Sequence, residues 1–267
     1  MEILLLGNYC HDTLVRPNGN LEVLGGSSSY ISKALEAARI DYELIAKVGE
    51  DFLYHSEIVK KPLISSKKRT THFLDTITQG NRTSVLGAVG EEIFPDDLPA
   101  GKFKIGLACG VMNEIRTETL LKLRAQVDFL ICDVQGLIRR VDENRNMVHV
   151  HLKDTPFFEL LPLIDVLKAN LFESTFIDFN TLGKTSLVIT EGPAGSRLIE
   201  KGVTTRIQAP ATQEVDATGA GDSYIAGFAI GYLKGMSMID AIRHGNRYGS
   251  LAVQTVGIPD FSLLDIP

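Results

Sequence analysis

Short apolar runs alternate with apolar positions at helical spacing along most of the chain. The run at Ile3–Leu6, ended by Gly7, contains no polar position, which is typical of a central strand buried on both faces. Further strands are predicted at residues 42–48, 103–108, 127–132, 148–152 and 187–190, with a strand-to-loop passage at 166–173. Helices are predicted at residues 31–38, 118–125, 224–233 and 237–253. This alternation indicates an α/β fold with a mostly parallel central sheet.

Two other segments have the pattern of β-hairpins. Residues 13–24 place a turn at Pro17-Asn18-Gly19-Asn20 between two short apolar segments. Residues 70–78 and 82–89 are predicted strands on either side of Gln79-Gly80-Asn81.

The most distinctive stretch is Val215–Tyr224, which precedes an apolar run with helical spacing. The small residues Gly219, Ala220 and Gly221 predict a helix N-terminus, whose amide groups and dipole suit an anion. Asp222 then has two interpretations: an ordinary first-turn acid, or a proton acceptor beside an anion site. The closely spaced small residues favour the second, because phosphoryl transfer to a hydroxyl needs one group to take the proton and others to hold charge.

The heptapeptide Asp216–Asp222 resembles the C-terminal signature of the ribokinase-like (PfkB) carbohydrate kinases, and only Ala217 departs from its commonest form. The resemblance implies that Asp222 is the catalytic base and that the amides of Gly219, Ala220 and Gly221 form an anion hole. It also implies a three-layer α/β fold in one domain, residues 1–267. The hairpin strands at about 13–24 and 70–89 would be a small β lid that excludes water during transfer.

A second group of residues is expected to bind the acceptor substrate. Asp12 follows the first strand at the end where α/β sheets bind ligands, although a turn aspartate is as consistent with its spacing. The resemblance favours a sugar-binding role for Asp12 and for Gly26. Tyr30 stands where many relatives carry a sugar-binding Asn. Gln135 and Arg139, near another strand end, are further candidates for contacts with the substrate.

The resemblance places the nucleotide and its metal in the second half of the chain. Asn170 and Glu173 match an Asn-x-x-Glu motif whose acid organises Mg²⁺ around the phosphates, although the same spacing is also common at helix starts. Thr190, Gly192 and Gly195 match a nucleotide-contacting turn, and Asn246 begins a segment expected beside adenine. ATP and Mg²⁺ are therefore the expected cofactors.

Several longer segments resemble one branch of the family, the plant-type myo-inositol kinases. They are Gly7–Asp12, Leu24–Gly26, Lys47–Gly49, Asp133–Arg139 and Gly245–Ser250. That branch also tolerates an apolar or aromatic residue at the position of Tyr30. The expected reaction is ATP-dependent phosphorylation of a small polyol, with myo-inositol as the leading substrate. A sugar or nucleoside kinase, and a catalytically silent ligand-binding relative, are the alternatives.

Composition narrows the possible partners and the cellular compartment of the protein. The 267 residues carry a net charge of -6, so a polyanion-binding surface and nucleic-acid partners are not expected. Three scattered cysteines indicate neither a disulfide framework nor a zinc site, and they fit a reducing compartment. No apolar run is long enough for a signal peptide or a membrane span, so we expect a cytoplasmic protein, with a homodimer through the lid as in relatives.

A third class of function, an NAD-dependent Rossmann enzyme, does not fit the sequence. A dinucleotide fingerprint would place three glycines directly after the first strand, and Gly7-Asn8-Tyr9 lacks the second and third. A silent relative would be expected to have lost its carboxylate or its anion site, and Asp222 and Gly219–Gly221 are all present. An active kinase is therefore favoured.

Overall fold

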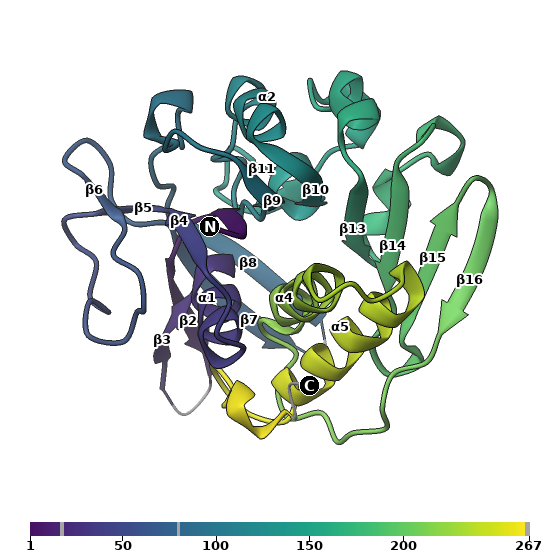
Figure 1. The fold of residues 1–267 in the computed structure, drawn as a ribbon. Helices are drawn as coiled ribbons and strands as arrows, with labels where there is room; N and C mark the ends of the chain where they lie inside the picture. Colours follow the sequence, from purple (N-terminus) through teal and green to yellow (C-terminus); the bar gives the residue numbers. More distant parts are fainter. Residues whose placement is uncertain (17–18, 79–80, 265–267) are drawn as a thin grey trace.

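The computed structural model describes residues 1–16, 19–78 and 81–264. Its main sheet is built from β1 (Ile3–Leu6), β4 (Tyr42–Ile45), β9 (Phe103–Ala108), β10 (Val127–Asp133), β13 (Val166–Asn170), β14 (Ser186–Thr190), β15 (Ser196–Glu200) and β16 (Val203–Ile207). These eight strands have the order β16-β15-β14-β13-β10-β9-β1-β4 (Figure 1). All pairs from β14 to β4 are parallel, and β15 and β16 add an antiparallel edge. The predicted α/β fold with a mostly parallel sheet is confirmed.

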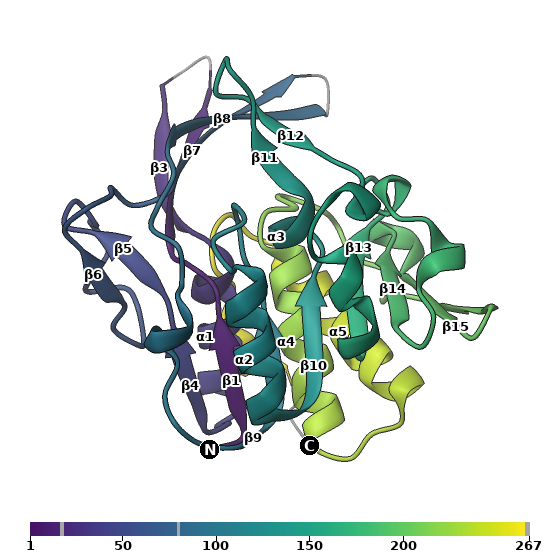
Figure 2. The same cartoon turned by 90° about the horizontal axis from the view of Figure 1, so that it is seen from above.

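Helices cover both faces of the main sheet and complete a three-layer architecture (Figure 2). On one face lie α1 (Ser27–Ala37), α4 (Ala220–Leu233) and α5 (Met238–Ala252). On the other face lie α2 (Thr117–Gln126) and the short α3 (Gln135–Ile138). Within the described ranges, none of these helices has the length and apolar character that crossing a membrane would require.

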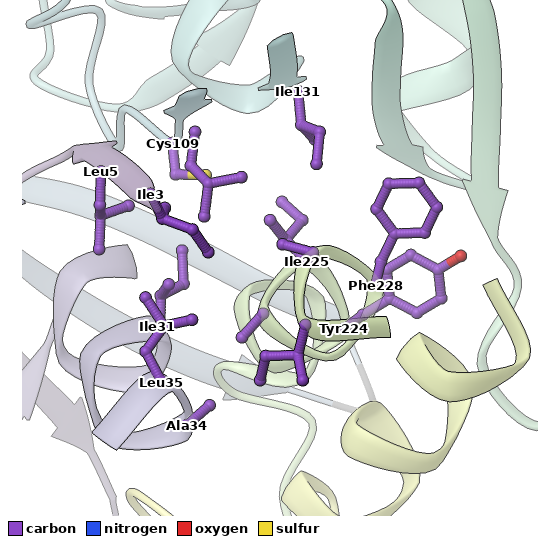
Figure 3. Packing of buried hydrophobic residues seen from close by; sticks show 14 of the residues in the cluster. Ile3, Leu5, Ile31, Ala34, Leu35, Cys109, Ile131, Tyr224, Ile225 and Phe228 are labelled. Carbon is purple, nitrogen blue, oxygen red and sulfur yellow. The ribbon is translucent and has the colours of Figure 1, made fainter. Parts of the chain in front are cut away.

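The first strand shows why an uninterrupted apolar run was needed. Ile3 and Leu5 pack against α1 and α4, while Leu4 and Leu6 face the core on the α2 side. All four side chains are fully buried, because successive residues of a strand point to opposite faces and both faces are covered. Figure 3 shows Ile3 and Leu5 beside the apolar residues of α1 and α4.

A second, four-stranded sheet lies beyond the carboxyl ends of the parallel strands (Figure 2). It consists of β2 (Cys10–Val15), β3 (Leu21–Gly25), β7 (His72–Thr78) and β8 (Asn81–Ala88), in the order β3-β2-β7-β8. We call it the lid sheet. Both predicted hairpins are present in it, although the centres of their turns, residues 17–18 and 79–80, lie outside the described residues. That the chain forms one domain stays a prediction.

Some predicted strands were wrong in extent or in partner. The segment 42–48 was expected to be one strand, but it divides at Ala46 into β4 and β5 (Lys47–Gly49), and β5 pairs with β6 (Leu63–Ser65). The segment 148–152 is not a strand of the main sheet. Instead β12 (Met147–His149) forms an antiparallel hairpin with β11 (Arg139–Val141). Apolar runs of this length do not specify which partner a strand takes.

The close packing of α4 on α5 depends on a small residue at position 227. A β-carbon built on Gly227 would lie 2.6 Å from the ring of Tyr248, which is fully buried. We expect Gly227→Ala to lower the free energy of unfolding by about 1–3 kcal/mol through overpacking. This cost exceeds the gain of about 1 kcal/mol that alanine brings to a helix. Urea denaturation measures the difference.

Gly249 in α5 provides the matched control. A β-carbon there would meet its nearest neighbour, the carbonyl oxygen of Ala220, at 3.4 Å, which is an ordinary contact. Gly249→Ala should therefore leave stability unchanged or raise it. Equal effects of the two substitutions would show that helix propensity, and not the fit against Tyr248, decides the outcome.

Candidate active site

A cavity of about 800 Å³ lies where the lid sheet, the carboxyl ends of the parallel strands and the start of α4 meet. Parallel strands end at the same edge of a sheet, so residues far apart in the sequence come together there. Every site residue expected from the sequence lines this one cavity. The structure thus brings the candidates together, while the role of each stays a prediction.

The start of α4 has the form expected of an anion site. Gly219 has a left-handed backbone (φ 73°) as the N-cap residue, and no side chain caps the first turn. A β-carbon on Gly219 would lie 2.1 Å from the ring of Tyr30, and one on Gly221 would lie 2.6 Å from Lys168 Nζ. Glycine is therefore needed at position 219, and at position 221 it leaves room for the ammonium group of Lys168. With Ala220 between them, the two glycines line the cavity at the positive end of the helix, where the backbone amide of Ala220 also donates to the carbonyl of Ala217 at 3.3 Å.

Asp222, in the first turn of α4, is partly exposed to the cavity, but its Oδ1 atom is buried and has no hydrogen-bond partner among the described residues. Burial raises the pKa of Asp222 to about 7, and the nearby charge of Asp133 adds to the shift, while Lys168 and Arg139 act against it. A carboxyl with this pKa can take up and release a proton near neutral pH, which suits a general base.

A buried ion pair lies beside this carboxyl, and the sequence analysis missed it. Lys168 Nζ and Asp133 Oδ2 are 3.0 Å apart, and their side chains are only 5% and 1% exposed. Burial alone would lower the pKa of Lys168, but the carboxylates of Asp133, Glu173 and Asp222 raise it, so the lysine stays charged. A charged residue inside the apolar run of β13 was the available signal, since such a residue needs a buried partner.

Asn170 and Glu173 bind each other at the end of β13. Glu173 Oε2 accepts from the backbone N–H of Asn170 at 2.9 Å, and Asn170 Oδ1 accepts from the backbone N–H of Glu173 at 2.8 Å. This reciprocal capping starts the 3₁₀ turn Glu173–Phe176, which is the helix-start pattern weighed against a metal role. The other carboxylate oxygen of Glu173 lies 3.6 Å from Arg139 Nη2.

Arg139, which was predicted to donate to the substrate, also has protein contacts. Its guanidinium contacts Glu173 and donates to the carbonyl of Val111 at 3.2 Å, and its role toward the substrate stays a prediction. It links the loop after β9 to the turn after β13, and it still lines the cavity. Gln135 follows Asp133 at the end of β10, and its backbone amide donates to Asp133 Oδ1 at 3.2 Å.

The expected nucleotide residues lie on the β14–β15 side of the cavity. Thr190 ends β14, and Gly192 and Gly195 occupy the following turn with positive φ angles of 56° and 90°. Asn246 is buried and its side-chain amide is engaged by the protein: it accepts from Ser196 Oγ and donates to the carbonyls of Ile207, the last residue of β16, and of Gln208. Asn246 lies within α5, whose extent of Met238–Ala252 confirms the helix predicted over 237–253.

The lid sheet supplies the opposite wall. Asp12 was expected in the loop after the first strand, but it lies within β2 and is 5% exposed. A β-carbon on Gly25 would lie 2.2 Å from the carboxylate of Asp12, so glycine makes room for it. Gly26 turns the chain from β3 into α1 with φ 88°, and the ring of Tyr30 lies in the first turns of that helix. Phe73 and Ser84, which the sequence analysis did not single out, also line the cavity.

Comparisons with known proteins agree with this geometry. A model described as "pfkB family carbohydrate kinase" matches residues 145–262. An inositol 3-kinase of Arabidopsis thaliana is 36% identical over 273 residues, covering 98% of this chain and 76% of that protein.

Two solved structures share the fold. A pyrophosphate-dependent kinase of the ribokinase family, complexed with a pyrophosphate analog and myo-inositol, has a TM-score of 0.81 at 19% identity, covering 98% of this chain and 100% of its own. A ribokinase of Arabidopsis thaliana complexed with ribose and ATP has a TM-score of 0.73 at 21% identity, covering 99% and 98%. The fold and the site thus define a ribokinase-like small-molecule kinase. More narrowly, the chain belongs to the pfkB family of carbohydrate kinases.

The raised pKa of Asp222 has a consequence for stability. Because the pKa is about 7 in the folded protein and about 3.8 when unfolded, the folded state holds the proton more tightly between these values. The penalty for ionising Asp222 is therefore absent below pH 4, grows as the pH rises, and is complete above pH 7. We expect Asp222→Asn to stabilise the protein at pH 8 by about 1–3 kcal/mol and to have no such effect at pH 4.

Urea denaturation of both proteins at the two pH values measures this difference. Comparing variant with wild type cancels the contributions of the other titrating groups. A stabilisation that is the same at pH 4 and pH 8 would show that the Asp222 carboxylate is not under electrostatic strain.

Proposed function

We propose that the protein transfers the terminal phosphoryl group of ATP to a hydroxyl of a cyclic polyol, with myo-inositol as the preferred acceptor. The observation that carries this proposal is the buried Oδ1 of Asp222, which has no hydrogen-bond partner in the described part of the chain, beside the N-terminus of α4. A proton acceptor and an anion-binding helix terminus in one cavity are the two groups that phosphoryl transfer to a hydroxyl requires. The 36% identity to an inositol 3-kinase supports the choice of acceptor.

In the proposed reaction, Asp222 accepts the proton of the attacking hydroxyl as its oxygen forms a bond to the terminal phosphorus. The bond from that phosphorus to the bridging oxygen breaks, and ADP leaves with the electron pair. The amides of Gly219, Ala220 and Gly221 stabilise the charge on the transferred group. Lys168, held by Asp133 next to Gly221, adds a fixed positive charge at the same place.

A magnesium ion bound with ATP would neutralise phosphate charge, and Glu173 is our proposed contact for it. Among the described residues, no group of three or more histidine, cysteine, aspartate or glutamate side chains forms a metal site. Mg²⁺ commonly keeps its waters and takes only one or two carboxylates together with phosphate oxygens. Since both oxygens of Glu173 already have protein contacts, a contact through water fits this residue better than direct ligation. Asn170 orients the carboxylate.

The acceptor would lie between α4 and the lid sheet. We propose that Asp12 and Gln135 bind its hydroxyls, that Gly26 allows the backbone to approach it closely, and that the ring of Tyr30 contacts one face. On the other side of the cavity, we propose that Thr190, Gly192, Gly195 and Asn246 surround the nucleotide. A hydroxyl-rich ring bound by fixed polar groups is discriminated more strongly than one in an apolar pocket.

Two further proposals concern the setting of the protein. We propose a homodimer formed through the lid sheet, because β3 is an edge strand of that sheet and can pair with a strand of a second copy. We also propose a reducing compartment such as the cytoplasm, because Cys10, Cys109 and Cys132 are all free thiols.

We expect myo-inositol to be phosphorylated by ATP with a kcat/KM about tenfold or more above that of ribose, fructose or any nucleoside. Coupled assays with equal concentrations of each acceptor measure this ratio. Asp222→Asn should lower kcat with myo-inositol by about 10² or more and leave ATP affinity nearly unchanged. Preferred turnover of a pentose or nucleoside would discard the inositol assignment but not the kinase. Near-normal turnover in folded Asp222→Asn would discard the assigned base.

For Glu173, we expect Glu173→Gln to raise the Mg²⁺ concentration needed for half-maximal rate more than it changes the KM for the polyol. The glutamine side chain keeps the shape of glutamate and one acceptor oxygen, so the hydrogen bond from the backbone N–H of Asn170 can persist. A Mg²⁺ titration at saturating ATP and polyol provides the measurement. If the titration is the same as for the wild type, Glu173 only begins the turn after β13.

A further inference from the structure

The lid sheet contains a buried hydrogen bond that the proposed mechanism does not use. Ser84 of β8 lies directly opposite Asp75 of β7, and Ser84 Oγ donates to Asp75 Oδ1 at 2.5 Å. Asp75 is 1% exposed and Ser84 is 9% exposed. Of the two, only Ser84 is among the described residues that line the cavity. Asp75 therefore holds the Ser84 side chain from the neighbouring strand without lining the cavity itself.

This arrangement fixes the chemical character of Ser84. A carboxylate only accepts hydrogen bonds, so the single proton of the serine hydroxyl is directed to Asp75. The lone pairs that remain on Ser84 Oγ can only accept. Ser84 consequently presents an acceptor to the cavity, in an orientation that a serine without such a partner would not keep.

Asp12 is on the same side of the lid sheet. In β2 it pairs with Phe73 of β7, and Asp75 follows Phe73 by two residues, so Asp12, Phe73, Asp75 and Ser84 share one face. Asp12, Phe73 and Ser84 line the cavity. The wall above the acceptor therefore carries two hydrogen-bond acceptors, on strands separated by β7, with an aromatic ring between them.

We infer that Ser84 is a specificity-determining residue that accepts a hydrogen bond from one non-reacting hydroxyl of the polyol, and that Asp75 is a positioning residue acting through it. The inference rests on the proposed function and refines it. A rigid ring held at two acceptors has few ways to lie in the cavity, so Ser84 also helps to decide which hydroxyl reaches Asp222. Removing it would allow the ring to rotate and a second hydroxyl to react.

The test uses myo-inositol and the series of its mono-deoxy analogues, each lacking one hydroxyl. The wild type should discriminate against several of these analogues. Ser84→Ala should lower kcat/KM for myo-inositol about tenfold, mainly through KM, and should abolish discrimination against one analogue only. Phosphorus NMR together with chiral chromatography of the products should show one isomer for the wild type and a mixture for the variant.

Thr83→Ala is the matched control, because Thr83 is the preceding residue of β8, is exposed, and donates to the carbonyl of Thr76 instead of facing the cavity. It removes a hydroxyl from the same strand and should leave every ratio unchanged. If Ser84→Ala keeps the wild-type ratio for every analogue and gives a single product, the inference is wrong although inositol phosphorylation stands. If the wild type does not phosphorylate myo-inositol, the proposed function fails and the inference fails with it.

Asp75→Asn separates positioning from simple structural support. Its amide can donate to Ser84 Oγ, so the serine proton is no longer directed away from the cavity. We expect the same loss of discrimination as in Ser84→Ala, and no further loss in the double variant, whose thermal unfolding is measured in parallel. Additive effects of the two substitutions on kcat/KM would mean that Asp75 does not act through Ser84.

Discussion

The site depends on a close approach of α4 to the carboxyl edge of the main sheet. Gly219 leaves space for the ring of Tyr30 and Gly221 leaves space for Lys168, so the start of the helix can contact α1 and β13 together. A side chain at either position would move the helix start away from the strand ends. The anion-binding amides and Asp222 would then no longer share a cavity with the residues of the lid sheet. Packing and chemistry are constrained here by the same few atoms.

Electrostatics add a second constraint at this edge. Asp133, Lys168, Glu173, Arg139 and Asp222 are clustered in and around the cavity, and their burial strengthens the interactions among their charges. Burial has the largest effect on the pKa of Asp222, the charge of Asp133 adds to it, and Lys168 and Arg139 partly oppose it. The carboxyl of Asp222 is thereby kept ready to take a proton at neutral pH. Such an arrangement costs folding stability, as is common for groups that must react.

The sequence was sufficient for features that are local or periodic. The apolar run of β1, the glycine turn before α1 and the helix after Gly221 were all predicted close to their observed positions. What a periodic pattern does not contain is the identity of a partner across space. This is why Tyr42–Val48 was expected to be one strand, although its two halves join different sheets. It is also why the contact of Arg139 with Glu173 was not predicted.

The paired buried polar residues were missed for the same reason. Taken singly, Lys168 and Asp133, like Ser84 and Asp75, give no distinctive sequence signal. Their role follows only from their pairing in the fold. The reciprocal bonds of Asn170 and Glu173 show the opposite case. There the spacing correctly predicted a local capping geometry, but local geometry does not say whether the carboxylate also serves a metal.

The position of β1 has a consequence for how the site comes into being. This first strand lies between β4 and β9 inside the main sheet. The site residues Lys168 and Asp222 come much later in the chain, from β13 and α4. No contiguous segment of the chain therefore contains the whole site. During synthesis the edge strand of the growing sheet stays unpaired until the next strand has been made. The chain would thus become able to bind substrate only in the last steps of folding, so substrate binding would indicate that the fold is complete.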